Sequence, residues 1–400
     1  MTTAFFLDNQ YRGGVDTFLI QLINHWPEDG RLRLDCNRHH PGLETIRAMV
    51  HRPLQISTYG DSISWTLFSG KARIPLDRFY VVRAAVVVFQ RIMPPILFLA
   101  NLIRFSVRFL LSGADSLLVV NGGYPASATA RSASLAWRIA GKGGVNIHNF
   151  HSHASPSNGK AKRMNDFLDR LILRASTYFV TVSRSCELSL RKRDVFLNSD
   201  RIRVIPNGIA DPGFPLHRPE TQKLSCLMLG TYHEYKGHSF LLEAFAQIRE
   251  RHATTELNMY GDGSEADRVR IEGLIDRFGL RECAFLHGFV TDPDALIRNA
   301  DVLVLPSQAH ESFGLTIVEA MARGVPVVAT RVGGIPEVLE DGVQGFVCSP
   351  SDASAFAAAI SRLLSSEELR RDLGAAGRRR YEQHFRAEQM SKAYHSLLCS

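Results

Sequence analysis

The stretch that decides the fold is 301-DVLVLPSQAHESFGLTIVEAMARGVPVVATRVGGIPEVLEDGVQGFV-347. Its apolar run Val302 to Leu305 predicts a short buried strand. After a polar loop, Leu315 begins an apolar pattern at helical spacing, and Gly324 stands where a glycine commonly ends a helix. A second apolar run, 325–329, predicts the next strand. This order of strand, loop, helix and strand predicts a parallel α/β sheet, which binds ligands at the carboxyl ends of its strands.

The loop and the helix that follows it carry two carboxylates, Glu311 and Glu319. The main-chain N–H groups of residues 312–315 are the unpaired donors of a helix N-terminus, which attracts anionic or oxygen-rich groups. A carboxylate beside sugar hydroxyls can accept two hydrogen bonds. A glutamate near a helix start can also serve only to complement the helix dipole. The residues therefore suit a sugar nucleotide, although neither glutamate indicates one by itself.

The whole string resembles the nucleotide-sugar-binding signature of the retaining glycosyltransferases of family four (glycosyl transferases group 1), which have the two-domain GT-B fold. The resemblance implies that Glu311 meets the donor sugar together with the main-chain amides of Phe313, Gly314 and Leu315. It also implies that Glu319 binds the ribose hydroxyls of the donor. Glu311 is thus expected to act in catalysis, and the other four residues in donor binding.

Length and composition fit a two-domain globular protein. The chain has 400 residues, of which 45% are hydrophobic and 22% charged, which suits two domains of roughly 200 residues each. Its six cysteines are scattered and its start lacks a secretory pattern, so we expect free thiols and a cytoplasmic location. The net charge is +7 without a nucleic-acid-binding signature. A phosphate-bearing donor and an anionic membrane surface explain this charge better than nucleic acid does.

Apolar runs alternate with helical patterns along the chain, which predicts parallel sheets. The predicted fold class is α/β of GT-B type, with two Rossmann-like doubly wound parallel-sheet domains facing a central cleft. The predicted parts are an N-terminal acceptor domain at 1–210, a linker at 211–221, a nucleotide-sugar-binding domain at 222–384 and a C-terminal helix at 385–400. The resemblance implies that this last helix crosses back to the first domain.

Two further loops are candidates for holding a diphosphate. Gly13 and Gly14 lie between the first strand and the first helix, where a missing Cβ lets main-chain amides approach a phosphate, although an ordinary tight turn has the same composition. The resemblance implies that this loop faces the donor diphosphate. Lys236 lies in the first loop of the second domain, where it can place a positive charge on the same group. Thr231 stands where the family usually has an arginine, so one expected cation is missing.

Three histidines, at 148, 151 and 153, lie close together around the end of a predicted strand, which allows a metal site. No carboxylate or cysteine accompanies them, so the metal interpretation is disfavoured. His151 instead matches a family position that hydrogen-bonds the transferred sugar or the acceptor, and Gly288 matches a position near the nucleotide base. No cofactor and no metal are expected, because Lys236 and helix N-termini can offset the diphosphate charge.

The segment from Arg83 to Leu111 is unusual for a first domain. Pro94 and Pro95 are expected to break any continuous helix, and only twelve residues separate Arg91 from Arg104, too few for a membrane span. A polar stripe (Asn101, Arg104, Arg108, Ser112) is predicted opposite an apolar one (Leu99, Leu102, Ile103, Phe109, Leu110). Such a helix either packs on the sheet with its arginines outward or lies in the interface of an anionic membrane.

The resemblance implies a hexosyltransferase that moves a sugar from a UDP- or GDP-sugar to a hydroxyl, with retention of anomeric configuration. The expected acceptor is a glycan or glycolipid, that is, a polysaccharide or lipid-linked precursor. A non-catalytic sugar-nucleotide-binding homologue is the alternative. A dinucleotide-dependent oxidoreductase is disfavoured, because it needs G-x-G-x-x-G after the first strand and Gly13-Gly14 is followed by Val15-Asp16-Thr17.

Overall fold

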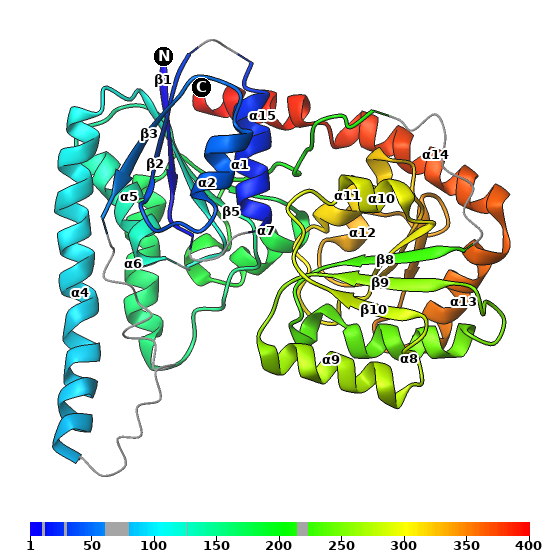
Figure 1. Ribbon diagram of the computed structural model, residues 1–400. Helices are drawn as coiled ribbons and strands as arrows, with labels where there is room; N and C mark the ends of the chain where they lie inside the picture. The colour runs from blue at the N-terminus through cyan, green and yellow to red at the C-terminus, as the bar shows by residue number, and fades with distance from the viewer. Residues whose placement is uncertain (10–12, 28–29, 61–79, 126, 214–222) are drawn as a thin grey trace. The chain divides into compact units, whose positions relative to one another are not determined.

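The computed structural model describes residues 1–9, 13–27, 30–60, 80–125, 127–213 and 223–400. The chain forms two compact units. Unit 1 comprises 1–181, 187–205 and 391–400, and unit 2 comprises 182–186 and 206–390. Each unit is built on a parallel sheet with helices packed against it (Figure 1). The predicted fold class of two Rossmann-like parallel-sheet domains is confirmed.

The sheet of unit 1 has seven parallel strands in the order β3-β2-β1-β4-β5-β6-β7. Their bounds are β1 Thr2–Leu7, β2 Arg31–Asn37, β3 Leu54–Tyr59, β4 Ser116–Asn121, β5 Asn146–Phe150, β6 Tyr178–Thr181 and β7 Ile202–Val204. The chain runs outward from β1 to β3 and then returns to β4 on the other side of β1. The order of strands therefore reverses between β1 and β4, the place where open α/β sheets bind ligands.

The α-helices of unit 1 are α1 Gly14–Asn24, α2 Leu43–Met49, α4 Tyr80–Leu111, α5 Ala128–Ile139 and α6 Lys162–Ala175. Two more helices are shared between the units. They are α7 Arg184–Arg191, which changes unit after Cys186, and α15 Ala387–Leu398, which changes unit after Met390. Short 3-10 turns are η1 Gly159–Ala161 and η2 Asp194–Phe196.

Unit 2 has six parallel strands in the order β10-β9-β8-β11-β12-β13, with the reversal between β8 and β11. The strands are β8 Ser225–Leu229, β9 Glu256–Tyr260, β10 Ala284–His287, β11 Val302–Leu305, β12 Val327–Thr330 and β13 Gly345–Cys348. The helices are η3 Glu234–Lys236, α8 His238–Ile248, α9 Glu265–Arg277, α10 Asp294–Asn299, α11 Leu315–Ala322, α12 Ile335–Val338, α13 Ala353–Ser365 and α14 Glu367–His384.

The predicted strand at 302–305 is β11, and it is buried on both faces. Val302 and Val304 pack into the core cluster that includes residues of α8, α9 and α13, whereas Leu303 and Leu305 pack into the one that includes residues of α11 and α12. Alternate side chains of a strand point to opposite faces, so a strand between two helix layers must be apolar throughout. The continuous apolar run in the sequence reflects this double burial.

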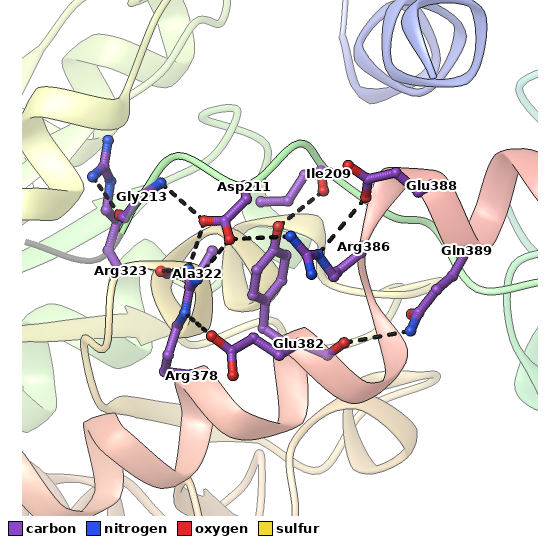
Figure 2. A network of polar contacts seen from close by, with 11 residues as sticks. Ile209, Asp211, Gly213, Ala322, Arg323, Arg378, Glu382, Arg386, Glu388 and Gln389 are labelled. Atoms are coloured by element: carbon purple, nitrogen blue, oxygen red, sulfur yellow. Dashed lines mark hydrogen bonds and ion pairs between the residues drawn. The ribbon is translucent and has the colours of Figure 1, made fainter. Parts of the chain in front are cut away.

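The first residues of the predicted linker are anchored within unit 2. Figure 2 shows Asp211 accepting two hydrogen bonds from Arg378 of α14, at 2.8 and 2.6 Å, and a longer one from Arg386. Arg323 donates to the carbonyl oxygen of Gly213 at 2.8 Å. Hydrogen bonds from Arg378 are the main reason why the pKa of Asp211 is lowered. Of the predicted linker at 211–221, the part from 214 onward lies outside the described residues.

A short break separates the helix expected at 385–400 from the helix before it. The helix α14 ends at His384, and α15 begins at Ala387. Between them the main chain pairs with Ile209, whose N–H donates to the carbonyl oxygen of Phe385 and whose own carbonyl accepts from Ala387. This pairing with a distant segment replaces the helical hydrogen bonds.

The prolines at 94 and 95 do not break the helix in which they lie, contrary to expectation. The helix α4 runs without interruption from Tyr80 to Leu111. A proline has a helical φ angle itself and removes only its own N–H donor, so a long helix can continue past a pair of them, with local distortion. No helix among the described residues is both long and apolar enough to cross a membrane.

Contrary to the expectation of a helix packed on the sheet with its arginines outward, Arg108 of α4 is turned toward the sheet of unit 1. Phe105 and Phe109 are buried against the sheet of unit 1. Arg108 donates to Asp35 of β2 at 2.6 Å, and Arg104 donates to the carbonyl oxygen of Gly60 at 3.0 Å. These arginines bind groups of their own unit. Five apolar side chains at helical spacing are left 52–63% exposed: Ile96, Leu99, Ile103, Val107 and Leu110.

Candidate functional site

Two residues predicted to bind the donor follow adjacent strands of unit 2. Lys236 ends the turn η3 after β8, and Glu311 lies in the loop after β11. Because β8 and β11 are neighbours and parallel, the two loops leave the same edge of the sheet. This is also where the strand order of unit 2 reverses. The fold alone therefore brings the two side chains to the position at which such sheets bind ligands.

Lys236 and Glu311 form an ion pair. Lys236 Nζ lies 2.8 Å from Glu311 Oε2, which also accepts a hydrogen bond from Ser307 Oγ at 3.2 Å. Their side chains are 18% and 13% exposed. The pair is therefore reachable from solvent but sheltered enough for its charges to interact strongly. Ser307 was not predicted, although a polar residue directly after a strand and a proline is a weak signal of such a role.

Gly237 lets the loop of Lys236 approach the end of β11. Its φ angle is +82°, and a Cβ atom would lie 1.9 Å from the carbonyl oxygen of Pro306. Any other residue would push the two loops apart. The glycine after Lys236 therefore sets the distance over which the ion pair with Glu311 can form.

The predicted amide donors 313–315 begin the helix α11. Gly314 has a φ angle of +89° and caps the helix, and Leu315 is its first residue. The side chain of Phe313 is buried and packs edge-on against Phe385, with ring centroids 5.8 Å apart. Phe313 therefore anchors the loop through its ring, and only its main chain can meet a ligand. The N–H groups at this helix start suit a sugar or phosphate oxygen.

Residues that the sequence did not indicate hold this loop in place. Ser183 Oγ donates to the carbonyl oxygen of Ser312 at 2.6 Å, and Gly334 N–H donates to that of Glu311 at 2.9 Å. The Glu337 carboxylate accepts from the N–H groups of residues 184 and 185 at 2.6 and 2.8 Å, which fixes the segment that carries Ser183. Nothing in the local pattern around these residues signals contacts over such sequence distances.

Glu319 lies further along α11 and is half-buried. Burial, followed by the negative charges of Asp292 and Asp294, raises its pKa to about 7. A carboxylic acid with this pKa is partly protonated near neutral pH. Its capacity to accept two hydrogen bonds from a ribose therefore depends on pH in the physiological range.

We expect the apparent affinity for a nucleotide-sugar donor to increase about tenfold between pH 6 and pH 8, as a group of this pKa ionises. The raised pKa means that the accepting carboxylate is lost as pH falls through 7, so binding weakens on the acid side. The donor KM, measured over this range, checks the prediction. Glu319→Gln should bind the donor more weakly, and its donor KM should not change with pH over this range. The prediction is contradicted if the donor KM of the Gln variant changes with pH as much as that of the wild type, or if that of the wild type does not change.

Gly288 follows β10, on the same edge of the sheet as the other loops of the site. It is exposed, and its carbonyl oxygen accepts a hydrogen bond from Gly261 N–H at 3.3 Å. Among the described residues, a Cβ atom on Gly288 would meet nothing within 4 Å. β9 lies between β10 and β8, so the loop of Gly288 is not adjacent to that of Lys236 in the sheet order.

In unit 1, Gly13 and Gly14 lie where β1 gives way to α1. Both are exposed, and no atom of the described part of the chain lies within 4 Å of a Cβ placed on Gly13. Gly13 N–H donates to Asp16 Oδ2 at 3.0 Å, whose carboxylate thereby occupies one donor of the helix start. The glycines thus leave open space beside the main chain at the edge where unit 1 would bind a ligand.

His151 directly follows β5, and its ring packs against Phe18 of α1 at a centroid distance of 4.3 Å. Its Nε2 is buried and has no hydrogen-bond partner among the residues that the structure describes. Burial lowers the pKa of His151 to about 3, so the ring is neutral at physiological pH. A neutral imidazole with a free nitrogen can accept from, or donate to, a hydroxyl. Since α1 begins at Gly14, the ring and the glycine loop belong to the same edge of unit 1.

The three neighbouring histidines do not converge. His148 lies within β5, fully buried, and its Nδ1 is 2.9 Å from Ser134 Oγ of α5, whereas the ring of His151 faces α1. His148 and His151 are three positions apart, an odd number, so a strand places them on opposite faces, and β5 itself ends at Phe150. Within the described ranges, no group of three potential ligands is close enough to hold a metal ion.

Two family models and several curated proteins match parts of this chain. Residues 12–211 match the family model "Glycosyltransferase Family 4", and residues 214–380 match "Glycosyl transferases group 1". N-acetyl-alpha-D-glucosaminyl L-malate synthase of Bacillus anthracis is 32% identical over 178 residues, 44% of this chain and 45% of that protein. Phosphatidyl-myo-inositol mannosyltransferase of Mycobacterium leprae is 37% identical over 181 residues, 44% and 47% of the two chains. This chain thus spans about half the length of the curated relatives that it matches.

Solved structures agree with the fold over nearly the whole chain. A glycosyltransferase from Rickettsia africae superposes with a TM-score of 0.76 at 19% identity, covering 99% of this chain and 97% of that one. The Anabaena protein HepE in complex with UDP and glucose gives 0.75 at 18% identity, covering 100% and 99%. The family model "Glycosyltransferase Family 4" matches half of the sequence, and these solved structures share the fold over nearly the whole chain. This chain therefore belongs to the glycosyltransferases of family 4.

Proposed function

We propose that the protein transfers a sugar from a nucleotide-diphosphate sugar to an acceptor hydroxyl. The observation that carries this proposal is the Lys236–Glu311 ion pair, which lies where the strand order of unit 2 reverses, beside the N-terminus of α11. A cation and a helix start suit a diphosphate, and a carboxylate suits sugar hydroxyls. Family membership supports the same activity, and the fold relative HepE was solved with UDP and glucose.

Each predicted residue receives a role in this proposal. In unit 2, Lys236 neutralises the leaving diphosphate and Glu319 accepts from the ribose. Glu311 holds the hydroxyls of the transferred sugar together with the amides of 313–315, and Gly288 lies near the base. In unit 1, the glycine loop at 13–14 meets the diphosphate, and His151 hydrogen-bonds the transferred sugar or the acceptor. The neutral ring and unpaired Nε2 of His151 support that role.

We further propose that transfer retains the anomeric configuration without a covalent enzyme intermediate and without a metal ion. A retaining glycosidase places two carboxylates on either side of the scissile bond. Here Glu311 is already paired with Lys236, which makes it a holder of hydroxyls and a poor nucleophile. The acceptor hydroxyl would attack from the face of the leaving group, and a donor phosphate oxygen would take its proton.

The acceptor is proposed to be a glycan or glycolipid, encountered at the cytoplasmic side of a membrane. One relative, from Mycobacterium leprae, is named for mannosyl transfer to phosphatidyl-myo-inositol. In this chain, the exposed apolar stripe of α4 (Ile96, Leu99, Ile103, Val107, Leu110) offers a surface for lipid. No acidic residue occurs from 78 to 114, so anionic headgroups would meet no repulsion from this segment.

Membrane contact predicts a specific loss of binding. Ile103→Glu combined with Leu110→Glu should reduce sedimentation with anionic liposomes at low salt by tenfold or more, because burying each such side chain contributes about 1.5–3 kcal/mol. Val269→Glu, at a 58% exposed position on α9, is the matched control and should leave binding unchanged. Wild-type protein that ignores these liposomes, or that buries the stripe in a dimer, would contradict the proposal.

The activity itself is tested by a donor screen. Purified protein is incubated with UDP- and GDP-sugars and a panel of glycan and glycolipid acceptors, and the products are identified by mass spectrometry and proton NMR of the new anomeric centre. We expect one donor to give an acceptor product with the donor's anomeric configuration. Nucleotide binding without transfer or hydrolysis, even in single-turnover reactions, would favour the alternative of a non-catalytic sugar-nucleotide-binding homologue.

A further inference from the structure

A buried pair of residues ties together the two ends of the glycine loop in unit 1. Asp16, in the first turn of α1, lies 2.8 Å from His40 Nε2 through its Oδ1 and accepts from Gly13 N–H through its Oδ2. His40, in the loop after β2, places Nδ1 3.0 Å from the carbonyl oxygen of Asn9. Asn9 precedes the glycine loop and Asp16 follows it. One imidazole ring therefore connects both sides of the loop.

The surroundings of His40 fix its protonation state. The carbonyl oxygen of Asn9 only accepts hydrogen bonds, and so does an ionised carboxylate. The contacts of both ring nitrogens with these two acceptors favour the imidazolium form of His40, in which both nitrogens donate. Burial opposes this charge, but the hydrogen bond and negative charge of Asp16, the contact with Asn9 and the charge of Asp8 outweigh it and raise the pKa of His40.

The side chains of His40 and Asp16 are buried and closely packed. The side chains of His40 and Asp16 are 0% and 4% exposed. A Cβ atom on Gly42 would lie 2.5 Å from Asp16 Oδ2 and 2.8 Å from His40 Nε2. A glycine at 42 is therefore required for the ring to reach the carboxylate. A buried ion pair of this geometry is costly to disrupt on one side only.

We propose that His40 is a positioning residue that holds the loop of Gly13 and Gly14 in its donor-binding form through Asp16 and the carbonyl of Asn9. This inference rests on the proposed role of the glycine loop in binding the donor diphosphate. His40 does not touch the substrate. It fixes the Asp16 carboxylate that orients Gly13 N–H, and it keeps the approach of α1 to β1 constant.

The contact has a defined dependence on pH. A histidine whose pKa is higher in the folded than in the unfolded state stabilises the fold fully below its unfolded value, and this contribution is lost as pH rises through the folded pKa. Among the described residues, the charged groups that face the ring are Asp16 and Asp8. Deprotonation removes the donor to Asn9, because a neutral ring has only one N–H. Donor binding should therefore weaken on the alkaline side, opposite to the effect of Glu319.

The test compares His40→Gln with His39→Gln, which alters an exposed neighbouring histidine, and with Asp16→Asn, which keeps the shape of the pair and removes its charge. Nitrogen-15 NMR of the histidine rings in the full-length protein should show both nitrogens of His40 protonated at pH 7. Amide exchange at Gly13 and the donor KM should each rise about tenfold in His40→Gln and Asp16→Asn, as expected for loss of a charged hydrogen bond, with kcat within about twofold. His39→Gln should match the wild type.

The alkaline increase in donor KM should be present in the wild type and absent in His40→Gln. A neutral ring at pH 7, or unchanged Gly13 exchange in both variants, would overturn the inference. Gly13→Ala separates it from the proposed function, since this position has open space for a methyl group. If Gly13→Ala raises the donor KM and His40→Gln does not, the role of His40 fails alone. If Gly13→Ala also leaves KM unchanged, the role of the loop fails with it.

Discussion

Replacement of Lys236 by alanine is expected to lower kcat/KM for the nucleotide-sugar donor about 100- to 1,000-fold, the usual effect of removing one preorganised group that stabilises developing negative charge. Thr231 occupies the position at which the family usually has a second cation, so the diphosphate of the donor would depend mainly on Lys236. Removal of the lysine also leaves Glu311 with only Ser307 as a hydrogen-bond partner among the contacts described above.

Steady-state kinetics and a double-mutant cycle check this prediction. Lys223→Ala is the matched control, because Lys223 forms an exposed pair with Glu256 at 2.8 Å in the same unit and should leave kinetics unchanged. If Lys236 and Glu311 act together, the effects of Lys236→Ala and Glu311→Ala should be strongly non-additive. If Lys236→Ala lowers kcat/KM less than threefold, or if the effects of the two substitutions are fully additive, the pair contributes no more than a surface ion pair.

Replacement of Asp169 by alanine is expected to destabilise unit 1 by about 3–5 kcal/mol, because it leaves a buried guanidinium without its counter-charge. Asp169 is fully buried on α6. Its carboxylate accepts from Tyr124 Oη and from Arg193 Nε, both at 2.8 Å. Arg193 is 1% exposed and donates also to the carbonyl oxygen of Ser155 at 2.6 Å. Neither remaining partner can turn to water when the carboxylate is removed.

Chemical denaturation, followed by a probe in unit 1 such as the buried Trp137, measures this loss. Asp194→Ala provides the control, because Asp194 is 72% exposed and pairs with Lys162 at the surface. Its effect should stay within about 0.5 kcal/mol. Equal stability of the two variants would mean that the Asp169–Arg193 pair contributes no more than a surface pair.

The parts of the fold that the sequence predicts well are those with local signals. β11 has the predicted bounds, because a strand buried on both faces is apolar at every position. β2 and β3 carry polar residues among their apolar ones, as Arg33 and Asp35 show, and apolar runs do not predict them. The direction of the α4 faces also escapes prediction. It depends on Asp35, a residue far away in sequence that pairs with Arg108.

The residues of the candidate site also divide into those that the sequence indicates and those that it does not. Family resemblance points to Glu311, Glu319 and Lys236, and the neighbouring positions of β8 and β11 bring Glu311 and Lys236 into contact. The residues that hold the loops of the site in place could not be predicted from the sequence. Ser183 contacts Ser312 across 129 positions, and His40 contacts Asp16 across 24. Such contacts arise because the order of strands brings distant segments together. Periodicity and local motifs therefore do not predict them.

The central claim is most directly tested by the kinetics of nucleotide release from the preferred sugar nucleotide in the presence of acceptor, for the wild type, Glu319→Ala and Glu311→Ala. We predict that Glu319→Ala raises the donor KM by about tenfold or more, as loss of a charged hydrogen bond implies, and that Glu311→Ala lowers kcat more than it raises KM. Unchanged kinetics in both variants would contradict the assignment of this loop and helix as the donor site.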